Sequence, residues 1–262
     1  MATIISVANQ KGGVGKTTTA FNLAWALTEL NSQVLLIDND PQGNLTSYAL
    51  SEDNPPQLTI DEIYVTRKSQ NILDMSQLTK INENLFILAA DSMLAGVEFY
   101  LVSRPDKEYI LKRAISSVVE HFDYVIIDNP PALNLLTVNG LVASESVIIP
   151  VQLEFFSLEG IVLLQNTIKS LHDRNPGLEI LGIIPNMFDN RRKLNWEVLD
   201  ALKKQFGEKV FESKIHNSVK IAESSGHGKS ILSYAPQSRS SAEYIEFAKE
   251  VISHVRETET GA

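Results

Sequence analysis

Lys11-Gly12-Gly13-Val14-Gly15-Lys16-Thr17 lies between an apolar run at residues 3–8 and a helical pattern at residues 17–30. A strand, a glycine loop and a helix in this order form the setting that a phosphate-binding P-loop requires. The glycines let the backbone turn and point its N–H groups at phosphate oxygens. The positive N-terminal end of the helix adds to the attraction for an anion. This segment therefore predicts a nucleotide-binding P-loop.

The side chains of the loop indicate how a nucleotide would be held. We expect Lys16 to contact the β- and γ-phosphates and the Thr17 hydroxyl to ligate Mg²⁺, a hard cation that takes oxygen ligands. The expected cofactors are therefore ATP and Mg²⁺. The residues expected to surround the nucleotide phosphates are Lys11, Gly12, Gly13, Val14, Gly15, Lys16, Thr17 and Thr18.

Lys11 is an additional lysine at the start of the loop, and Gln10 stands where the standard pattern has glycine. A lysine in this place cannot easily fold back onto the phosphates of its own subunit. It could instead contact a nucleotide held by a second subunit that faces it. The alternative, which the residues alone leave open, is an ordinary solvated surface lysine.

Three aspartates follow apolar runs and complete the expected site. Asp38 and Asp40 come after the run at residues 34–37, and Asp128 ends the run at residues 124–127. Because the carboxyl ends of parallel strands meet at one edge of a sheet, these carboxylates should face the P-loop. We expect Asp40 to orient the attacking water, and Asp38 and Asp128 to hold Mg²⁺ through water.

The rest of the chain predicts one α/β domain. Further apolar runs at residues 85–88, 146–151 and 180–185 alternate with helical patterns, which favours a mostly parallel twisted sheet with helices on both faces. We assign residues 1–256 to this P-loop NTPase domain and residues 257–262 to a frayed tail. The chain has no cysteine, which excludes disulfides and cysteine-bound clusters. It has no secretory signal and no apolar stretch of roughly 20 residues, so we expect a cytoplasmic protein.

Four motifs together resemble the ParA/Soj family of deviant Walker ATPases. The resemblance extends from about residue 1 to residue 255. The motifs are KGGVGKTTTA at 11–20, LLIDNDPQGNLTS at 35–47, DYVIIDNPPALNLLTVNGL at 123–141 and PVQLEFFSLEGI at 150–161.

The resemblance implies a function for several of these residues. Lys11 corresponds to the family's signature lysine, which contacts the phosphates of the partner subunit in an ATP-dependent homodimer. Asp40 corresponds to the hydrolytic aspartate. The family further implies non-specific DNA binding, association with the nucleoid in the ATP state, and a ParB-like partner that stimulates weak intrinsic hydrolysis. Its members partition plasmids or chromosomes.

A net charge of −9 opposes DNA binding, but residues 189–220 contain eight Lys or Arg against five Asp or Glu. The expected DNA-binding residues are therefore Arg191, Arg192, Lys193 and Lys220. The family's IPRNVR pattern is replaced by IHNSVK at residues 215–220, which puts adenine and DNA contacts of that loop in question. By resemblance, Asn186 and His216 are expected near the adenine.

Two other functions are compatible with the same P-loop. A MinD-like ATPase cycles on and off membranes through a basic amphipathic C-terminal helix. Residues 241–262 contain two Lys or Arg against five Asp or Glu, and Tyr244, Phe247, Val251 and Val255 have the spacing of core positions. No membrane contact is therefore expected. A ParA variant that positions a cargo other than DNA cannot be separated from a partition ATPase by these motifs.

Overall fold

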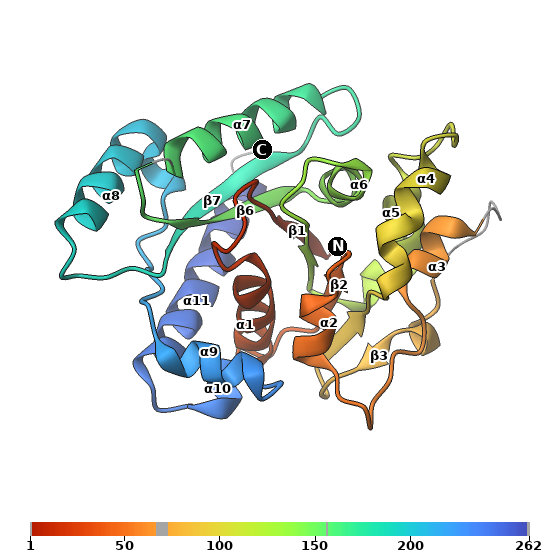
Figure 1. The fold of residues 1–262 in the computed structure, drawn as a ribbon, viewed down its shortest axis with the longest axis horizontal. Helices are drawn as coiled ribbons and strands as arrows, with labels where there is room; N and C mark the ends of the chain where they lie inside the picture. Colours follow the sequence, from red (N-terminus) through yellow and green to blue (C-terminus); the bar gives the residue numbers. More distant parts are fainter. Residues whose placement is uncertain (1, 67–72, 156, 261–262) are drawn as a thin grey trace.

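A seven-stranded sheet forms the centre of the computed structural model, which describes residues 2–66, 73–155 and 157–260 (Figure 1). The strand order is β3-β4-β2-β5-β1-β6-β7, and every pairing is parallel except that of β3 with β4. The strands are β1 (Thr3–Val7), β2 (Val34–Asp38), β3 (Thr79–Lys80), β4 (Leu85–Leu88), β5 (Tyr124–Asp128), β6 (Ser146–Gln152) and β7 (Glu179–Asn186). The predicted α/β fold with one mostly parallel sheet is confirmed.

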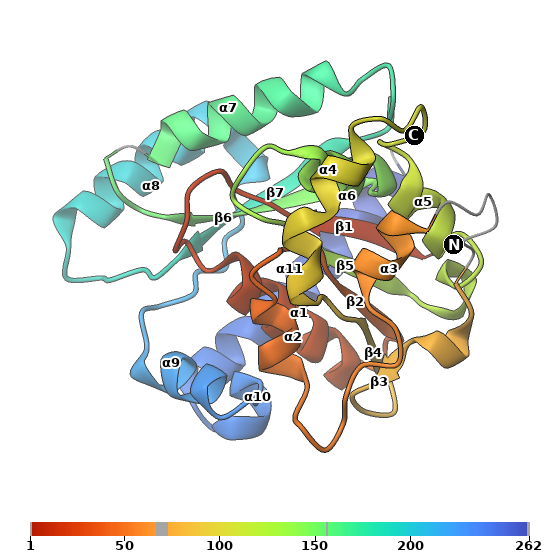
Figure 2. The same cartoon turned by 45° about the vertical axis from the view of Figure 1, so that its right-hand side comes forward.

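Helices cover both faces of the sheet, as Figures 1 and 2 show for α1 and α11 on one face and α7 on the other. One apolar cluster lies between the sheet and the layer that contains α1 and α11. Two more lie between the sheet and the helices of the opposite face. The helices are α1 (Lys16–Glu29), α2 (Asn44–Ala49), α3 (Ile60–Val65), α4 (Val97–Leu101), α5 (Ile110–Ile115), α6 (Leu135–Ala143), α7 (Ser157–Ser170), α8 (Lys193–Phe206), α9 (Val219–Gly226), α10 (Ile231–Tyr234) and α11 (Arg239–Thr260).

Continuous apolar runs form the central strands because helices bury both of their sides. Every residue of β2 and β5 is buried, including the aspartate that ends each strand. The β2–β5 register places Asp38 beside Asp128, and the β1–β5 register places Val7 beside Asp128. The turn after β1 therefore lies directly next to both carboxylates, at the carboxyl edge of the sheet.

α11 packs its apolar stripe against the core, as its spacing predicts. Tyr244, Phe247, Val251 and Val255 are all buried. Residues 257–260 continue this helix, and residues 261–262 lie outside the described part, so the domain boundary at residue 256 stays a prediction. In the part of the chain that the structure describes, no helix is both long and apolar enough to cross a bilayer.

Candidate nucleotide site

The turn between β1 and α1 is shaped by glycines in the left-handed region. Gly13 has φ 74° and Gly15 has φ 84°. A Cβ on Gly15 would lie 2.4 Å from Nδ2 of Asn186, so this position excludes a side chain for two independent reasons. Gly15 is also the N-cap of α1, whose first turn carries no acidic residue. The positive end of α1 is therefore available to an anion, as the sequence predicts.

A cavity of about 610 Å³ lies against this turn. Its walls come from the P-loop and the start of α1, from the segment after β2 with α2, from the turns after β5 and β7, and from α9. The lining residues are Gly12, Gly13, Gly15, Lys16, Thr17, Thr18, Asp40, Gln42, Asn44, Ser47, Tyr48, Pro131, Met187, Ser225 and Gly226. A nucleotide-sized cavity bordered by a P-loop is the arrangement that phosphate binding needs.

Lys16 is the buried cation of the site, with 7% of the residue exposed. Burial lowers the pKa of its ammonium group, and the nearby carboxylates of Asp128 and Asp40 oppose that shift. Its Nζ lies 3.4 Å from the carbonyl oxygen of Lys11. A lysine poised among acids and backbone dipoles fits the predicted contact with phosphate oxygens.

Asp128 is fully buried, and neither of its carboxylate oxygens has a hydrogen bond of standard geometry among the described residues, although the Thr17 side chain is near enough to stabilise the ionised carboxylate. Burial, and then the charge of Asp38, raise its pKa well above the usual range; Thr17 and Lys16 partly oppose the shift. An unpartnered buried carboxylate is costly unless a cation or its water shell completes it. No group of three His, Cys, Asp or Glu in the described ranges chelates a metal directly. Mg²⁺ keeps several waters and takes phosphate oxygens, so a single carboxylate and a hydroxyl are enough to help hold it.

Asp38 is hydrogen-bonded, unlike Asp128. Its Oδ2 accepts hydrogen bonds of 2.8 Å from both the backbone N–H and the hydroxyl of Thr46, and its Oδ1 accepts one of 3.2 Å from the N–H of Asp40. Burial still raises the pKa of Asp38 to about 6. Both carboxylate oxygens of Asp38 thus hold the chain that follows β2. Its role in the Mg²⁺ shell stays a prediction.

Asp40 lies at the wall of the large cavity, next to the P-loop. Its Oδ1 accepts a 3.0 Å hydrogen bond from the N–H of Gln42, which fixes the carboxylate against its own turn. The residue is 6% exposed and faces the space in which phosphate would lie. The geometry is compatible with orienting a water, the role predicted for it.

Lys11 does not line the cavity, although its neighbours Gly12 and Gly13 do. Its ammonium group forms an ion pair with Glu154, just after β6, and the two side chains are 39% and 45% exposed. Its backbone N–H donates to Oδ1 of Asn9 at 2.9 Å. Lys11 therefore points away from the phosphates of its own subunit, and Glu154 is a partner that the sequence did not indicate.

A smaller cavity of about 250 Å³ adjoins the large one and shares Gly15 and Thr18 with it. Asn186 and His216, expected near the adenine, both line it. The Asn186 amide donates to the carbonyl of Val14 at 2.8 Å, so it also fastens β7 to the P-loop. The structure brings these two residues together; their contact with a base stays a prediction.

His216 belongs to a polar cluster that links three segments. Its Nδ1 lies 2.7 Å from Oε1 of Glu243, and its Nε2 lies 2.6 Å from Oδ1 of Asn190. Arg239 contacts both Glu243 and the imidazole. The cluster joins α11 to the loop before α8. His216 therefore holds these two segments together and also lines the smaller cavity.

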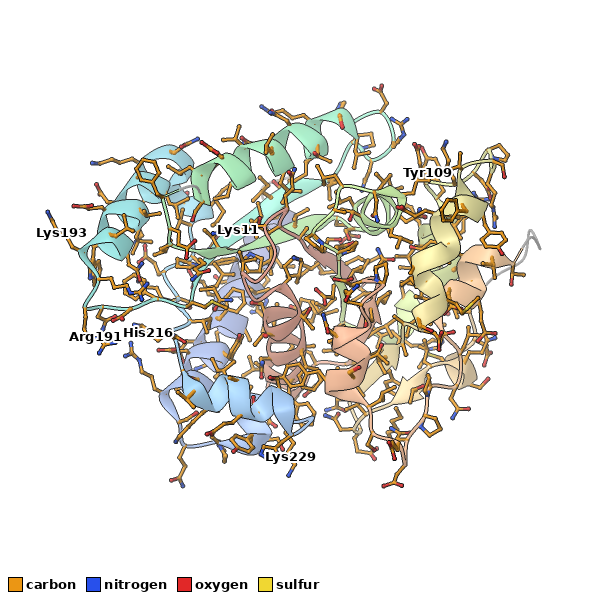
Figure 3. All side chains as sticks on the ribbon, viewed as in Figure 1. Lys11, Tyr109, Arg191, Lys193, His216 and Lys229 are labelled. Atoms are coloured by element: carbon orange, nitrogen blue, oxygen red, sulfur yellow. The ribbon has the colours of Figure 1, made fainter. Side chains whose placement is uncertain are left out.

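The expected DNA-binding residues lie outside the cavities. Arg191 and Lys193 are at one edge of the molecule, the left-hand edge in Figure 3, and Lys11 is central in that view. Arg191 forms a bidentate pair with Asp189 and holds the pKa of that carboxyl near 2. Arg192 is 3.8 Å from the same carboxylate. Lys220 is exposed in the first turn of α9.

Several lining residues were not anticipated. Tyr48, Ser225 and Gly226 form part of the large cavity. Tyr48 directly follows the motif at residues 35–47, whereas Ser225 and Gly226 lie on α9, which no quoted motif covers. Gln42 and Asn44 could have been predicted, because they belong to the segment that directly follows Asp40. A signal for α9 was absent, since only tertiary packing brings it to the P-loop.

Comparisons with known proteins found similar chains. The family described as an AAA domain matches residues 2–180. Sporulation initiation inhibitor protein Soj of Bacillus subtilis (strain 168) is 42% identical, covering 96% of this chain and 98% of that protein. Chromosome partitioning protein ParA of Caulobacter vibrioides is 37% identical, covering 99% and 97%. The structure of cobyrinic acid a,c-diamide synthase from Mycobacterium smegmatis with ADP and magnesium is 34% identical, with a TM-score of 0.81 and coverage of 98% and 96%.

Proposed function

Because this chain belongs to the ParA/Soj family of P-loop ATPases, we propose that it is a partition ATPase that dimerises with ATP and binds DNA non-specifically. The cofactors are ATP and Mg²⁺. The observation that carries the proposal is the separation of the two loop lysines. Lys16 lies inside the cavity, and Lys11 lies outside it on a partly exposed ion pair.

ATP would bind with its phosphates against residues 12–18 and its base in the adjoining smaller cavity. Lys16 and the N–H groups of the loop would neutralise the phosphate charge. Thr17 and Asp128 would hold Mg²⁺, directly and through water, with Asp38 behind them. The metal supplies electrostatic stabilisation of the phosphoryl oxygens when it is bound.

Hydrolysis needs a water aligned with the γ-phosphate, and Asp40 is the carboxylate proposed to orient it. The carboxylate is already fixed by the N–H of Gln42. No arginine lines the large cavity among the described residues. Slow turnover is therefore expected until a second protein, ParB-like in this family, completes or reshapes the site.

Dimerisation would bring the phosphate faces of two subunits together. Each Lys11 would then leave Glu154 and contact the phosphates of the other subunit. Because the triphosphate supplies the attracting charge, the dimer would require ATP. Pairing two subunits also doubles the phosphate contacts of Arg191, Arg192, Lys193 and Lys220, which makes DNA affinity depend on the nucleotide. The ATP form would then reside on the nucleoid in the cytoplasm.

Two substitutions test this proposal. Lys11→Ala should still bind ATP as a monomer but form no ATP-dependent dimer in analytical ultracentrifugation. Asp40→Ala should lower kcat about 10²–10⁴-fold, the usual contribution of a positioned general base. It should therefore accumulate as a DNA-bound dimer in fluorescence anisotropy with duplexes of unrelated sequence.

Other outcomes would contradict specific parts of the proposal. A normal ATP dimer of Lys11→Ala would refute the cross-subunit role, and unchanged hydrolysis by Asp40→Ala would refute that assignment. A dimer that forms with ATP but binds no DNA would indicate a different cargo surface. The ATPase would then position another cargo.

A further inference from the structure

α9 extends from the nucleotide cavity to Lys220, one of the expected DNA-binding residues. Ser225 and Gly226, at its C-terminal end, line the large cavity, whereas Lys220 in its first turn is exposed. An α-helix rises about 1.5 Å per residue, so Lys220 and Ser225 are about 7.5 Å apart along the axis. A nucleotide in the cavity therefore touches the same short helix that presents a proposed DNA contact.

Ser224 attaches the buried side of α9 to α2. Its side chain is fully buried, and its hydroxyl lies 3.1 Å from the hydroxyl of Tyr48 on α2. Ser224 donates in turn to the carbonyl of Ile221 at 2.9 Å. Asn22 of α1 donates to the Tyr48 hydroxyl at 3.4 Å. Hydrogen bonds in such a buried chain strengthen one another, because the local dielectric is low.

Tyr48 is held in place by burial and by a ring contact. Its residue is 5% exposed, and its ring lies 4.3 Å, centre to centre, from that of Phe21 on α1. Two residues earlier on α2, Thr46 donates twice to Asp38. Asp38 is the register neighbour of Asp128. A contiguous path of contacts thus runs from the proposed metal site through α2 to α9.

We propose that Tyr48 and Ser224 are positioning residues that couple the nucleotide site to α9, so that filling the cavity fixes how Lys220 is presented. A contact of this kind can shift an equilibrium only if it differs between the empty and filled states. The large cavity is bordered by Tyr48 and by Ser225 and Gly226 of α9, so a nucleotide that fills it would contact Tyr48 and the residues that directly follow Ser224. Only the last step, contact of Lys220 with DNA, rests on the proposed function.

Amide hydrogen exchange of residues 219–226 in the full-length protein tests the coupling. Addition of Mg²⁺ and a non-hydrolysable ATP analogue should slow exchange in the wild type. Ser224→Ala should reduce that protection about 2- to 10-fold, the factor that one net hydrogen bond allows. Its affinity for the analogue should change less than about threefold, because Ser224 does not line the cavity.

Tyr234→Phe is the matched control, since it removes a hydroxyl that contacts α9 at Glu223 on the exposed side, 3.4 Å away. It should retain full protection. Tyr48→Phe and Ser224→Ala both remove the Tyr48–Ser224 contact, so the double variant should lose less protection than the sum of the two single losses. Wild-type protection in Ser224→Ala, or additive losses, would overturn the coupling. Loss of protection in a protein that never binds DNA would leave the coupling intact and refute only the proposed DNA step.

Discussion

Asp38 shows how one buried carboxylate serves both folding and the site. Three donors fix it, from Thr46 and Asp40, yet burial outweighs them and raises its pKa to about 6. Its neighbour Asp128 is shifted in the same direction, partly by the charge of Asp38. Without a cation, two adjacent acids at the carboxyl edge of the sheet disfavour each other's ionisation.

This shift predicts a pH dependence of stability. The folded pKa of Asp38 exceeds its unfolded value, so the folded state binds more protons between about pH 4 and pH 6. The contribution of Asp38 to stability is present below about pH 4 and is lost as the pH rises through about 6. Between about pH 4 and pH 6 the nucleotide-free wild type should lose about 3 kcal/mol of unfolding free energy relative to Asp38→Asn, which has no carboxyl to ionise at this position. Urea titrations at a series of pH values measure it. A difference that does not vary with pH contradicts the raised pKa.

The loop between β1 and α1 is the element that the sequence predicted best. Its glycines have the backbone angles that the motif requires, and the strand and helix on either side begin and end within a residue or so of expectation. β3 and the short helices α2 and α9 were not predicted, because segments of two to eight residues are too short to show apolar periodicity; the motif at 35–47 includes residues 44–47 of α2 but does not mark them as a helix. Glu154 was missed because the ion pair depends on where β6 ends in space.

Gly15→Ala tests whether this loop is fixed by its backbone. A Cβ there would meet the Asn186 amide at 2.4 Å in a left-handed conformation, which disfavours alanine by about 1–3 kcal/mol. The unfolding free energy of the nucleotide-free protein should fall by that amount in denaturant titrations. Gly12→Ala is the matched control, because a Cβ on Gly12 meets nothing within 4 Å. Equal destabilisation by the two substitutions would show that the loop relaxes freely.

Charge is distributed unevenly over the whole molecule. The chain carries a net charge of −9, yet exposed arginines and lysines gather before and at the start of α8. Part of that positive charge is already neutralised by Asp189, which pairs with both Arg191 and Arg192. DNA binding by this surface would therefore be weak per subunit and strongly dependent on salt.

Reversal of Arg191 and Arg192 to glutamate should weaken binding to all duplex sequences alike and flatten the dependence of log affinity on log salt. Removal of one phosphate-binding side chain lowers the slope by about 1. Anisotropy titrations of the ATP-bound protein at several salt concentrations measure both effects. Reversal of Lys203 and Lys204 changes the net charge equally in the last turn of α8, at the other end of that helix from Arg191 and Arg192. If both double substitutions weaken DNA binding equally, the overall charge of the protein and not Arg191 and Arg192 would account for the binding.

The ion pair between Lys11 and Glu154 has a consequence for the assembled molecule. Given the cross-subunit role proposed for Lys11, a dimer with two nucleotides exchanges two internal ion pairs for two contacts between subunits. A dimer with one nucleotide exchanges one pair for one such contact, because the Lys11 that faces the empty subunit stays paired with Glu154. Each contact between subunits would therefore have to be stronger than the internal pair it replaces before the dimer forms.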